Sequence, residues 1–288
     1  LAAAAAAYIF VRSTAAAQQS LDFNGQRAMS DLSYQVNLGP RIPNSAAHAQ
    51  VVQWLQDTLG PAGWSVSLQK TTRLGHPIIN VIAKRGSGTP WVILGAHYDS
   101  RLWANQDPDP ANRQKPVPGA DDGASGVAVL TELARTLPKN LTGQVWLAFF
   151  DAEDNGEIPG WDWLLGSEEM ASSLPGKPDA VVILDMVGDA NLDIYKEKNS
   201  NPALTQAIWD TAAKLGYEKE FIPTAKYAML DDHTPFLNAG IPAVDIIDFD
   251  YPYWHTTQDT IDKTSAGSLK IVGETIQTWL LEEMKAKS

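Results

Sequence analysis

The sequence contains no cysteine among its 288 residues. It therefore has no disulfide framework, no thiolate metal site and no cysteine nucleophile, so any metal has to be held by histidine and carboxylate side chains. Histidine is scarce as well, and the chain has only His48, His76, His97, His233 and His255. Few imidazoles are thus available as metal ligands.

Positive charge is also in short supply. Lys and Arg number 22 against 34 Asp and Glu, which gives a formal net charge of -12. A protein of this sign repels phosphate backbones and anionic membrane surfaces, which argues against a nucleic-acid partner. The length and the 44% hydrophobic content suffice for one sizeable core and exclude a disordered or fibrous chain.

The N-terminal segment has an apolar run that is too short to span a bilayer. Residues 1–11 read LAAAAAAYIFV, and an Ala-x-Ala pattern follows at residues 15–17. This combination is typical of the end of a signal peptide or of a clipped membrane anchor. We therefore expect residues 1–20 to be a signal or anchor remnant and the protein to be exported, periplasmic or extracellular, or membrane-anchored. An Ala-rich helical tail is the alternative.

From about residue 45 onward, helical patterns alternate with apolar strands. Helices are expected at Ala46–Leu59, 125–137, Pro202–Leu215 and 268–284, and strands at 65–69, 78–83, 91–95, 144–150 and 180–186. The last three strands are nearly continuous apolar runs, as expected of strands covered on both faces. The pattern predicts an α/β fold, a three-layer αβα sandwich with a central mixed, mostly parallel sheet, formed as a single domain by residues 21–288.

Carboxylates and histidines follow several of the predicted strands. The residues concerned are His97 and Asp99, the pair Asp121 and Asp122, Asp151, Glu153 and Asp154, Asp185, and His255. The carboxyl ends of parallel strands share one sheet edge, where the chemistry of such folds collects. A divalent cation would offset the cost of gathering so many anions there. Two imidazoles with carboxylates suit Zn²⁺, with Mn²⁺ or Co²⁺ as alternatives.

Several of these residues also have structural interpretations. Asp122 can serve as a cap for the helix that begins near Ala124, and Asp99 can orient the His97 ring without contacting a metal. Most of the ten Trp residues are expected in the core.

Six motifs occur in a fixed order along the chain. They are GAHYDS at 95–100, PGADDGASG at 118–126, DAED at 151–154, LDMVGD at 184–189, DDHTPF at 231–236 and WHTTQDT at 254–260. With these motifs the chain from about residue 37 resembles the zinc exopeptidase superfamily of bacterial aminopeptidases and glutaminyl cyclases. The resemblance implies one or two Zn²⁺ ions per chain, Glu153 as general acid and base, and metal ligands at His97, Asp121, Asp154, Asp185 and His255. In a two-metal site Asp121 would bridge the ions.

The resemblance is closest to the glutaminyl-peptide cyclotransferases. Eleven residues separate Asp154 from Gly166, and this long loop carries Trp161 and Trp163, as cyclase loops do. Trp254, directly before His255, and Asp231 in DDHTPF are also similar to the cyclases, whereas residues 121–126 are nearer to the aminopeptidase form.

This resemblance implies an acyltransferase that converts the N-terminal Gln of peptides or proteins with a free N-terminus to pyroglutamate and releases ammonia. Asp185 and Asp231 would join Glu153 in the catalytic set, and Trp161, Trp163 and Trp254 would line the substrate pocket. A zinc aminopeptidase and a non-catalytic peptide-binding domain of the same fold are the alternatives. The sequence leaves the oligomeric state open.

Overall fold

The computed structural model describes residues 22–286, and the predicted signal or anchor segment, residues 1–20, lies outside them. The α-helices are α2 (Gly25–Asn37), α3 (Ala46–Leu59), α4 (Ala124–Thr136), α5 (Leu165–Ser173), α6 (Pro202–Leu215), α7 (Thr234–Asn238) and α8 (Ala266–Ala286). The strands are β1 (Ser65–Arg73), β2 (His76–Ser87), β3 (Trp91–His97), β4 (Gly143–Phe150), β5 (Ala180–Asp185), β6 (Ile194–Lys196), β7 (Phe221–Ala225) and β8 (Ala243–Ile247), and a short 3₁₀ helix spans Ile261–Lys263.

The six-stranded sheet has the order β1-β2-β4-β3-β5-β8. Strands β1, β2 and β4 pair antiparallel, and β4, β3, β5 and β8 run parallel to one another. The mixed, mostly parallel sheet that the sequence predicts is thus confirmed. The parallel half matters for function, because its four strands bring their carboxyl ends to the same edge.

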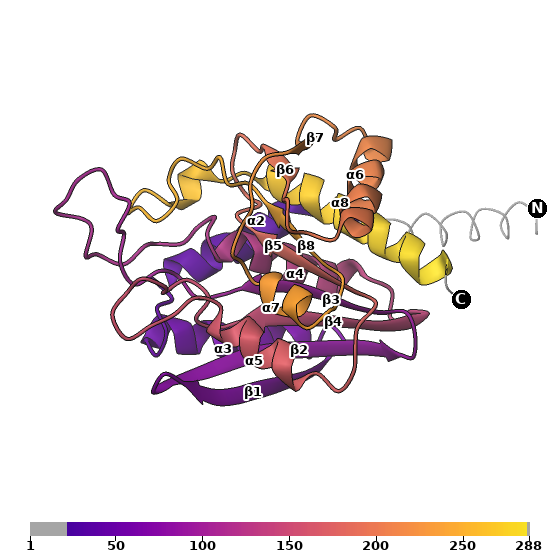
Figure 1. Ribbon diagram of the computed structural model, residues 1–288, viewed down its shortest axis with the longest axis horizontal. Coiled ribbons are helices and arrows are strands. Elements are labelled where there is room, and N and C mark those ends of the chain that lie inside the picture. The colour runs from indigo at the N-terminus through magenta and orange to yellow at the C-terminus, as the bar shows by residue number, and fades with distance from the viewer. Residues whose placement is uncertain (1–21, 287–288) are drawn as a thin grey trace, which may run out of the picture.

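Two helical layers cover the sheet, as Figure 1 shows. Helices α2, α3, α4, α6 and α8 share one apolar cluster, and α5 and α7 contribute to a second cluster on the opposite face. Strand β3 supplies both clusters alternately, since Val92 and Leu94 belong to the first and Ile93 to the second. This two-residue period is that of a strand buried on both faces. The αβα sandwich is therefore confirmed.

Local sequence signals set the ends of the helices that were predicted best. Helix α3 begins after Ser45, whose side chain accepts a hydrogen bond from the His48 N–H, and α6 begins after Asn201, which accepts one from the Leu204 N–H. Helix α6 ends at Leu215, and its C-cap residue Gly216 has a φ of 85°. Such caps satisfy backbone groups that the helix itself leaves unpaired.

Helix α4 lies unusually close to the sheet beside the site. A Cβ atom on Gly126 would be 2.1 Å from the Leu184 carbonyl oxygen of β5, so only glycine allows this approach. The contact fixes the start of α4, and the turn before it, against the carboxyl end of β5.

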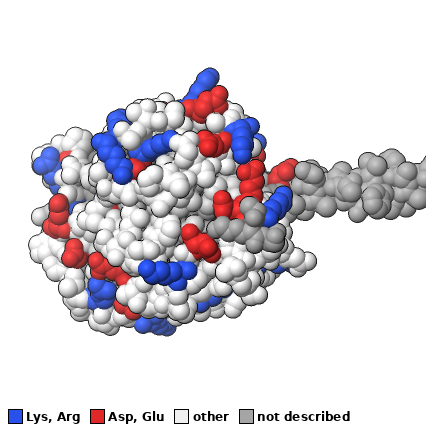
Figure 2. All heavy atoms as spheres, turned by 45° about the vertical axis from the view of Figure 1, so that its right-hand side comes forward, with Lys and Arg blue, Asp and Glu red and all other residues white. Residues whose placement is uncertain are grey.

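Much of the acidic charge is inside the protein. The buried carboxylates are Asp31, Asp99, Asp107, Asp121, Asp122, Glu132, Asp151, Glu153, Asp154, Asp185, Asp189, Glu197, Asp231, Asp232, Asp245, Asp248 and Asp259. On the face shown in Figure 2, by contrast, acidic and basic side chains are interspersed around a neutral central area. In the part of the chain that the structure describes, no helix has both the length and the apolar character needed to cross a membrane.

Candidate metal centre and active site

The candidate site lies at the carboxyl edge of the parallel strands. His97 ends β3 and Asp185 ends β5. Glu153 and Asp154 follow β4, Asp122 precedes α4, and His255 lies in the segment after β8. The loops from separate strands thus converge at one place, as the sequence predicts.

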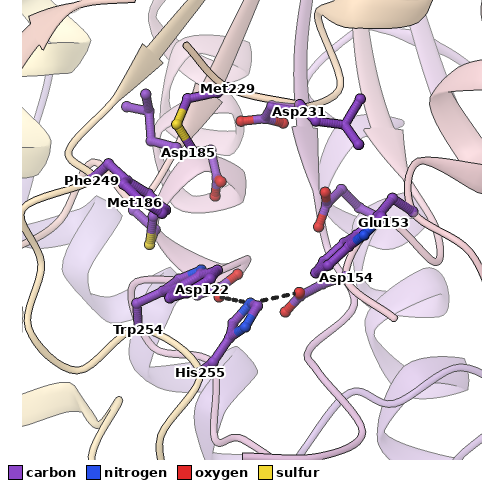
Figure 3. A pocket seen from close by; sticks show the side chains of 13 residues that line it. Asp122, Glu153, Asp154, Asp185, Met186, Met229, Asp231, Phe249, Trp254 and His255 are labelled. Carbon is purple, nitrogen blue, oxygen red and sulfur yellow. Dashed lines mark ion pairs between the residues drawn. The ribbon is translucent and has the colours of Figure 1, made fainter. Parts of the chain in front are cut away.

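Two groups of side chains have the spacing of metal ligands. In the first group, His97 Nε2 lies 3.1 Å from an Asp185 oxygen and 3.2 Å from an Asp122 oxygen. In the second group, His255 Nε2 lies 2.8 Å from an Asp154 oxygen and 3.6 Å from the other Asp122 oxygen. In each group one potential ligand atom from every residue lies within 4.8 Å of the others. Figure 3 shows His255 between Asp122 and Asp154.

The shared carboxylate is that of Asp122, which corrects the expectation for Asp121. The Asp121 carboxylate lies on another side of the turn, where it accepts a hydrogen bond of 2.6 Å from the Gly188 N–H. It belongs to neither ligand group. Gly123, with a φ of 97°, completes the turn, because a Cβ there would be 2.4 Å from the Asp99 carbonyl oxygen. The side chain of Asp122 also makes no cap hydrogen bond to α4, whose N-cap residue is Gly123.

Asp99 has the orienting position that was one of its sequence interpretations. An oxygen of Asp99 lies 3.5 Å from Nδ1 of His97, on the side of the ring opposite the ligand nitrogen. The same carboxylate accepts hydrogen bonds from the N–H groups of Glu153 and Asp154, at 3.1 and 3.3 Å. Asp99 therefore ties the end of β3 to the loop after β4.

Three residues at the site have a backbone conformation that is rare outside glycine. Ala152, Met186 and His255 have φ values of 53°, 44° and 55°. Such left-handed residues cost free energy of order 1–3 kcal/mol and persist where the surrounding contacts hold them. At these positions they turn the chain sharply, so that Glu153, Asp185 and the imidazole of His255 reach the same pocket.

A pocket of about 220 Å³ adjoins both ligand groups. Its lining residues are Asp122, Glu153, Asp154, Trp163, Asp185, Met186, Met229, Leu230, Asp231, Ile247, Phe249, Trp254 and His255. The carboxylates thus lie around the pocket: Figure 3 shows Asp122 and Asp185 on the side of Met186, Phe249 and Trp254, and Glu153 and Asp154 across from them. Sequence reasoning missed Met186, Met229, Leu230, Ile247 and Phe249. Met186 had a signal, since it directly follows Asp185.

Two of the three predicted pocket tryptophans lie in the wall. The ring of Trp254 stacks on His255 with centroids 3.7 Å apart, and that of Trp163 is nearly parallel to His255 at 6.0 Å. Trp161 instead stacks on His76, at 3.6 Å, and its expected place in the pocket is wrong. Gly156 packs against the Trp163 indole, whereas Trp161 packs against a separate cluster of Ile78, Ala152 and Leu165.

Burial controls the protonation of the acidic groups in the pocket. It raises the pKa of Glu153 well above its usual value, against the effect of His97, and nearby carboxylates raise this pKa further. Burial also raises the pKa of Asp185 to about 7, again partly opposed by His97. The raised pKa favours the protonated form of Glu153, and a carboxyl group of this kind can act as a general acid or base. Asp231 lies beside it in the wall.

The donor set fits a zinc ion. In the described chain, one oxygen each of Asp122 and Asp154 is buried without a hydrogen-bond partner, as is Nδ1 of His255. Buried carboxylate oxygens without partners are costly unless a cation neutralises them. One imidazole and two carboxylates would supply three nitrogen and oxygen ligands, the number that catalytic zinc sites take from the protein, and would leave a position for water or substrate.

The sheet, its helical layers and the cluster at the carboxyl edge define a zinc exopeptidase-like fold. The chain belongs to peptidase family M28, which residues 80–280 match. It is similar to the glutaminyl cyclase of Porphyromonas gingivalis, with 36% identity and a TM-score of 0.86 over 91% of this chain and 99% of that one. It is similar also to a Zn-dependent exopeptidase from Parabacteroides distasonis, at 33% identity, TM-score 0.86 and the same coverage.

A curated relative is the glutaminyl-peptide cyclotransferase of Boiga irregularis. It is 26% identical in an alignment 295 positions long, which covers 84% of this chain and 77% of the relative. The family resemblance inferred from the motifs is thereby confirmed.

Proposed function

We propose that this protein is a zinc-dependent glutaminyl-peptide cyclotransferase, which converts N-terminal Gln of peptides to pyroglutamate. The observation that carries the proposal is the narrow pocket formed where Trp163 and Trp254 lie against His255, with Glu153 in the same wall. Its volume of about 220 Å³ suits a single residue. A Gln whose side chain folds back onto its own amine fits such a space, and flat indole faces suit a planar carboxamide.

Asp122, Asp154 and His255 would hold the zinc ion beside this pocket. When bound, zinc supplies Lewis-acid polarisation of the side-chain carbonyl of the substrate. The second group, with His97 and Asp185, shares Asp122, and a second ion would be held there.

Glu153 carries the proton through the reaction. The α-amine nitrogen of the substrate forms a bond to its side-chain amide carbon, and Glu153 takes the proton that this nitrogen loses. The same carboxyl returns the proton to the amide nitrogen as the carbon–nitrogen bond breaks, so ammonia leaves and a five-membered lactam remains. Asp185 and Asp231 face the same cavity. The negative charge of Asp231, with that of Asp154 and Asp232, favours the proton on Glu153.

The alternative activity, removal of N-terminal residues, uses the same groups with a different nucleophile. Glu153 would then deprotonate a water that attacks the first peptide bond. The similarity to a Zn-dependent exopeptidase supports this second candidate.

The two activities are separated by giving the zinc-loaded protein a Gln-initiated peptide and a Leu-initiated peptide. Release of ammonia and free amino acid is then measured in parallel. We expect ammonia from the first and no leucine from the second, and leucine release without ammonia would show an aminopeptidase.

Glu153→Gln tests the proton carrier. We expect turnover to fall by at least about 10²-fold, the usual contribution of such a group, while bound zinc stays at the wild-type level because Glu153 belongs to neither ligand group. Glu157→Gln, in the same loop but exposed, is the matched control and should retain activity. Loss of zinc from the Glu153 variant would show that this residue is itself a ligand.

We also propose that the protein is exported or membrane-anchored, on the basis of the apolar run at residues 1–11 and the Ala-x-Ala pattern after it. Cell fractionation of the full-length protein tests this, and recovery only in the cytoplasm would contradict it.

A further inference from the structure

The segment 101–118, which we call the clamp loop, joins the end of the β3 motif to the turn that carries Asp122. It contains no helix or strand, but hydrogen bonds hold it in a defined conformation. Inside the loop, the Ala104 N–H donates to the Lys115 carbonyl at 2.8 Å and the Val117 N–H to the Arg101 carbonyl at 3.0 Å. Ordered loops of this length without secondary structure are uncommon and usually have a function.

The first residue of the clamp loop holds the segment that carries Asp154. The Arg101 side chain is 1% exposed, and its Nη1 donates to the Asp154 carbonyl at 2.9 Å and to the Asp154 carboxylate at 3.3 Å. Nη2 donates to the Gly156 carbonyl at 3.0 Å, and the guanidinium lies 4.8 Å over the Trp163 ring. Nε is held by Asn105, at 2.7 Å. The Arg101 side chain therefore holds both the main-chain carbonyl and the side chain of Asp154 in place.

The middle of the clamp loop holds the segment that carries His255. One carboxylate oxygen of Asp107 accepts from the N–H and the hydroxyl of Thr257, at 2.9 and 2.5 Å. The Gln106 N–H donates to the His255 carbonyl at 3.2 Å. The other Asp107 oxygen accepts from Asn112, at 3.2 Å, within the loop. His255 has a left-handed backbone, and such a conformation persists where the surrounding contacts hold it.

The far end of the clamp loop is anchored too. Arg41 is fully buried and donates to the carbonyl oxygens of Tyr98, Pro118 and Gly119, at 3.0, 2.9 and 2.5 Å. The loop cannot shift as a whole without breaking these hydrogen bonds. Its contacts to Asp154 and His255 therefore hold these two residues in a fixed position relative to each other.

We propose that the clamp loop presets the separation of Asp154 and His255 for metal binding, with Arg101 and Asp107 as positioning residues. Neither residue belongs to a ligand group, and each acts on a different member of the same one. The inference rests on the zinc site of the proposed function, and it is independent of whether the reaction is cyclisation or hydrolysis.

The test measures zinc affinity by competition with a chromophoric chelator, for the wild type and the variants Arg101→Met and Asp107→Asn. We expect each variant to bind zinc about 10- to 100-fold more weakly, the usual effect of losing a partner behind a ligand. Gln114→Ala, an exposed position of the same loop, is the matched control and should bind as the wild type does. The absorption bands of the Co²⁺-substituted variants should also shift, which a change in global stability alone would not produce.

Arg101→Lys and Thr257→Val are the milder substitutions. Each leaves part of the contact in place, and each should bind zinc with an affinity between that of the wild type and that of the severe variant. If Arg101→Met or Asp107→Asn fails to fold, the milder variant is measured in its place. It should then bind zinc more weakly than Gln114→Ala does. Folded variants with wild-type zinc affinity and unchanged Co²⁺ spectra would overturn the clamp alone. A wild-type protein that binds no zinc would overturn the metal site itself.

Discussion

Replacing one of two adjacent aspartates with asparagine should weaken metal binding, whereas replacing the other should not. Asp122→Asn removes a charge that the two ligand groups share, with its oxygens 3.2 Å from His97 and 3.6 Å from His255. We expect zinc affinity to fall by more than the roughly 100-fold that loss of an outer partner costs. At 1.4 kcal/mol for each tenfold change, the loss exceeds about 2.8 kcal/mol.

Asp121→Asn should leave zinc affinity unchanged. Its oxygen still accepts the Gly188 N–H, and the new amide adds a buried donor in place of an oxygen that has no hydrogen-bond partner in the described chain. The expected cost is about 1–3 kcal/mol of folding free energy, the usual penalty of one unsatisfied buried group. Zinc per chain is measured by elemental analysis after dialysis, and urea unfolding gives the stability. Zinc loss from the Asp121 variant with zinc retained by the Asp122 variant would refute the assignment.

Three further changes test other parts of the structure. The metal-free protein should lose stability as the pH rises from about 4 to about 7. Burial raises the pKa of Asp185 and of Asp259 from 3.8 to about 7 in the folded protein. The unfolded chain therefore releases these two protons at a lower pH than the folded protein does. The slope is at most about 1.4 kcal/mol per pH unit for each group, and urea unfolding that is more stable at pH 7 than at pH 5 would contradict it. Leu230→Ala, at the pocket rim where the side chain is 58% exposed, should raise KM for Gln-Leu peptides more than for Gln-Gly peptides, whereas Leu74→Ala, at a similarly exposed leucine, should change neither. Gly126→Ala should lower the free energy of unfolding by about 1–3 kcal/mol, because the new methyl group would be 2.1 Å from the main chain of β5. This cost should outweigh the better helix propensity of Ala. A variant that is more stable than the wild type in thermal unfolding would contradict the prediction.

The parts of the fold that the sequence predicted well are those with long periodic signals. Helices α3 and α6 have the predicted bounds, and the three central strands begin or end within two residues of prediction. Helix α2, the short helices α5 and α7, and the strands β6 and β7 were not predicted. Strand β7 is largely exposed and α7 has five residues, so neither presents an apolar period that can be recognised.

The site was predicted to the level of segments and less well to the level of single side chains. Two side chains differ from the prediction: Asp121, where the neighbouring Asp122 is the shared carboxylate, and Trp161, since only Trp163 of the two loop tryptophans lines the pocket. In each case the direction of the side chain depends on a distant contact, such as that of Asp121 with Gly188, or on how a loop packs. Loops lack the periodicity that assigns a face to each residue of a helix or strand, so the sequence alone does not reveal these directions.

The order of the candidate ligands along the chain has a consequence for biosynthesis. Translation delivers the N-terminal segments first, and they can begin to fold before the rest arrives. His255, however, follows the edge strand β8 and is the last member of its group to be made. A nascent chain that stops short of it presents the carboxylates of Asp122 and Asp154 without their imidazole, so cation uptake at this group comes after the whole six-stranded sheet has been synthesised.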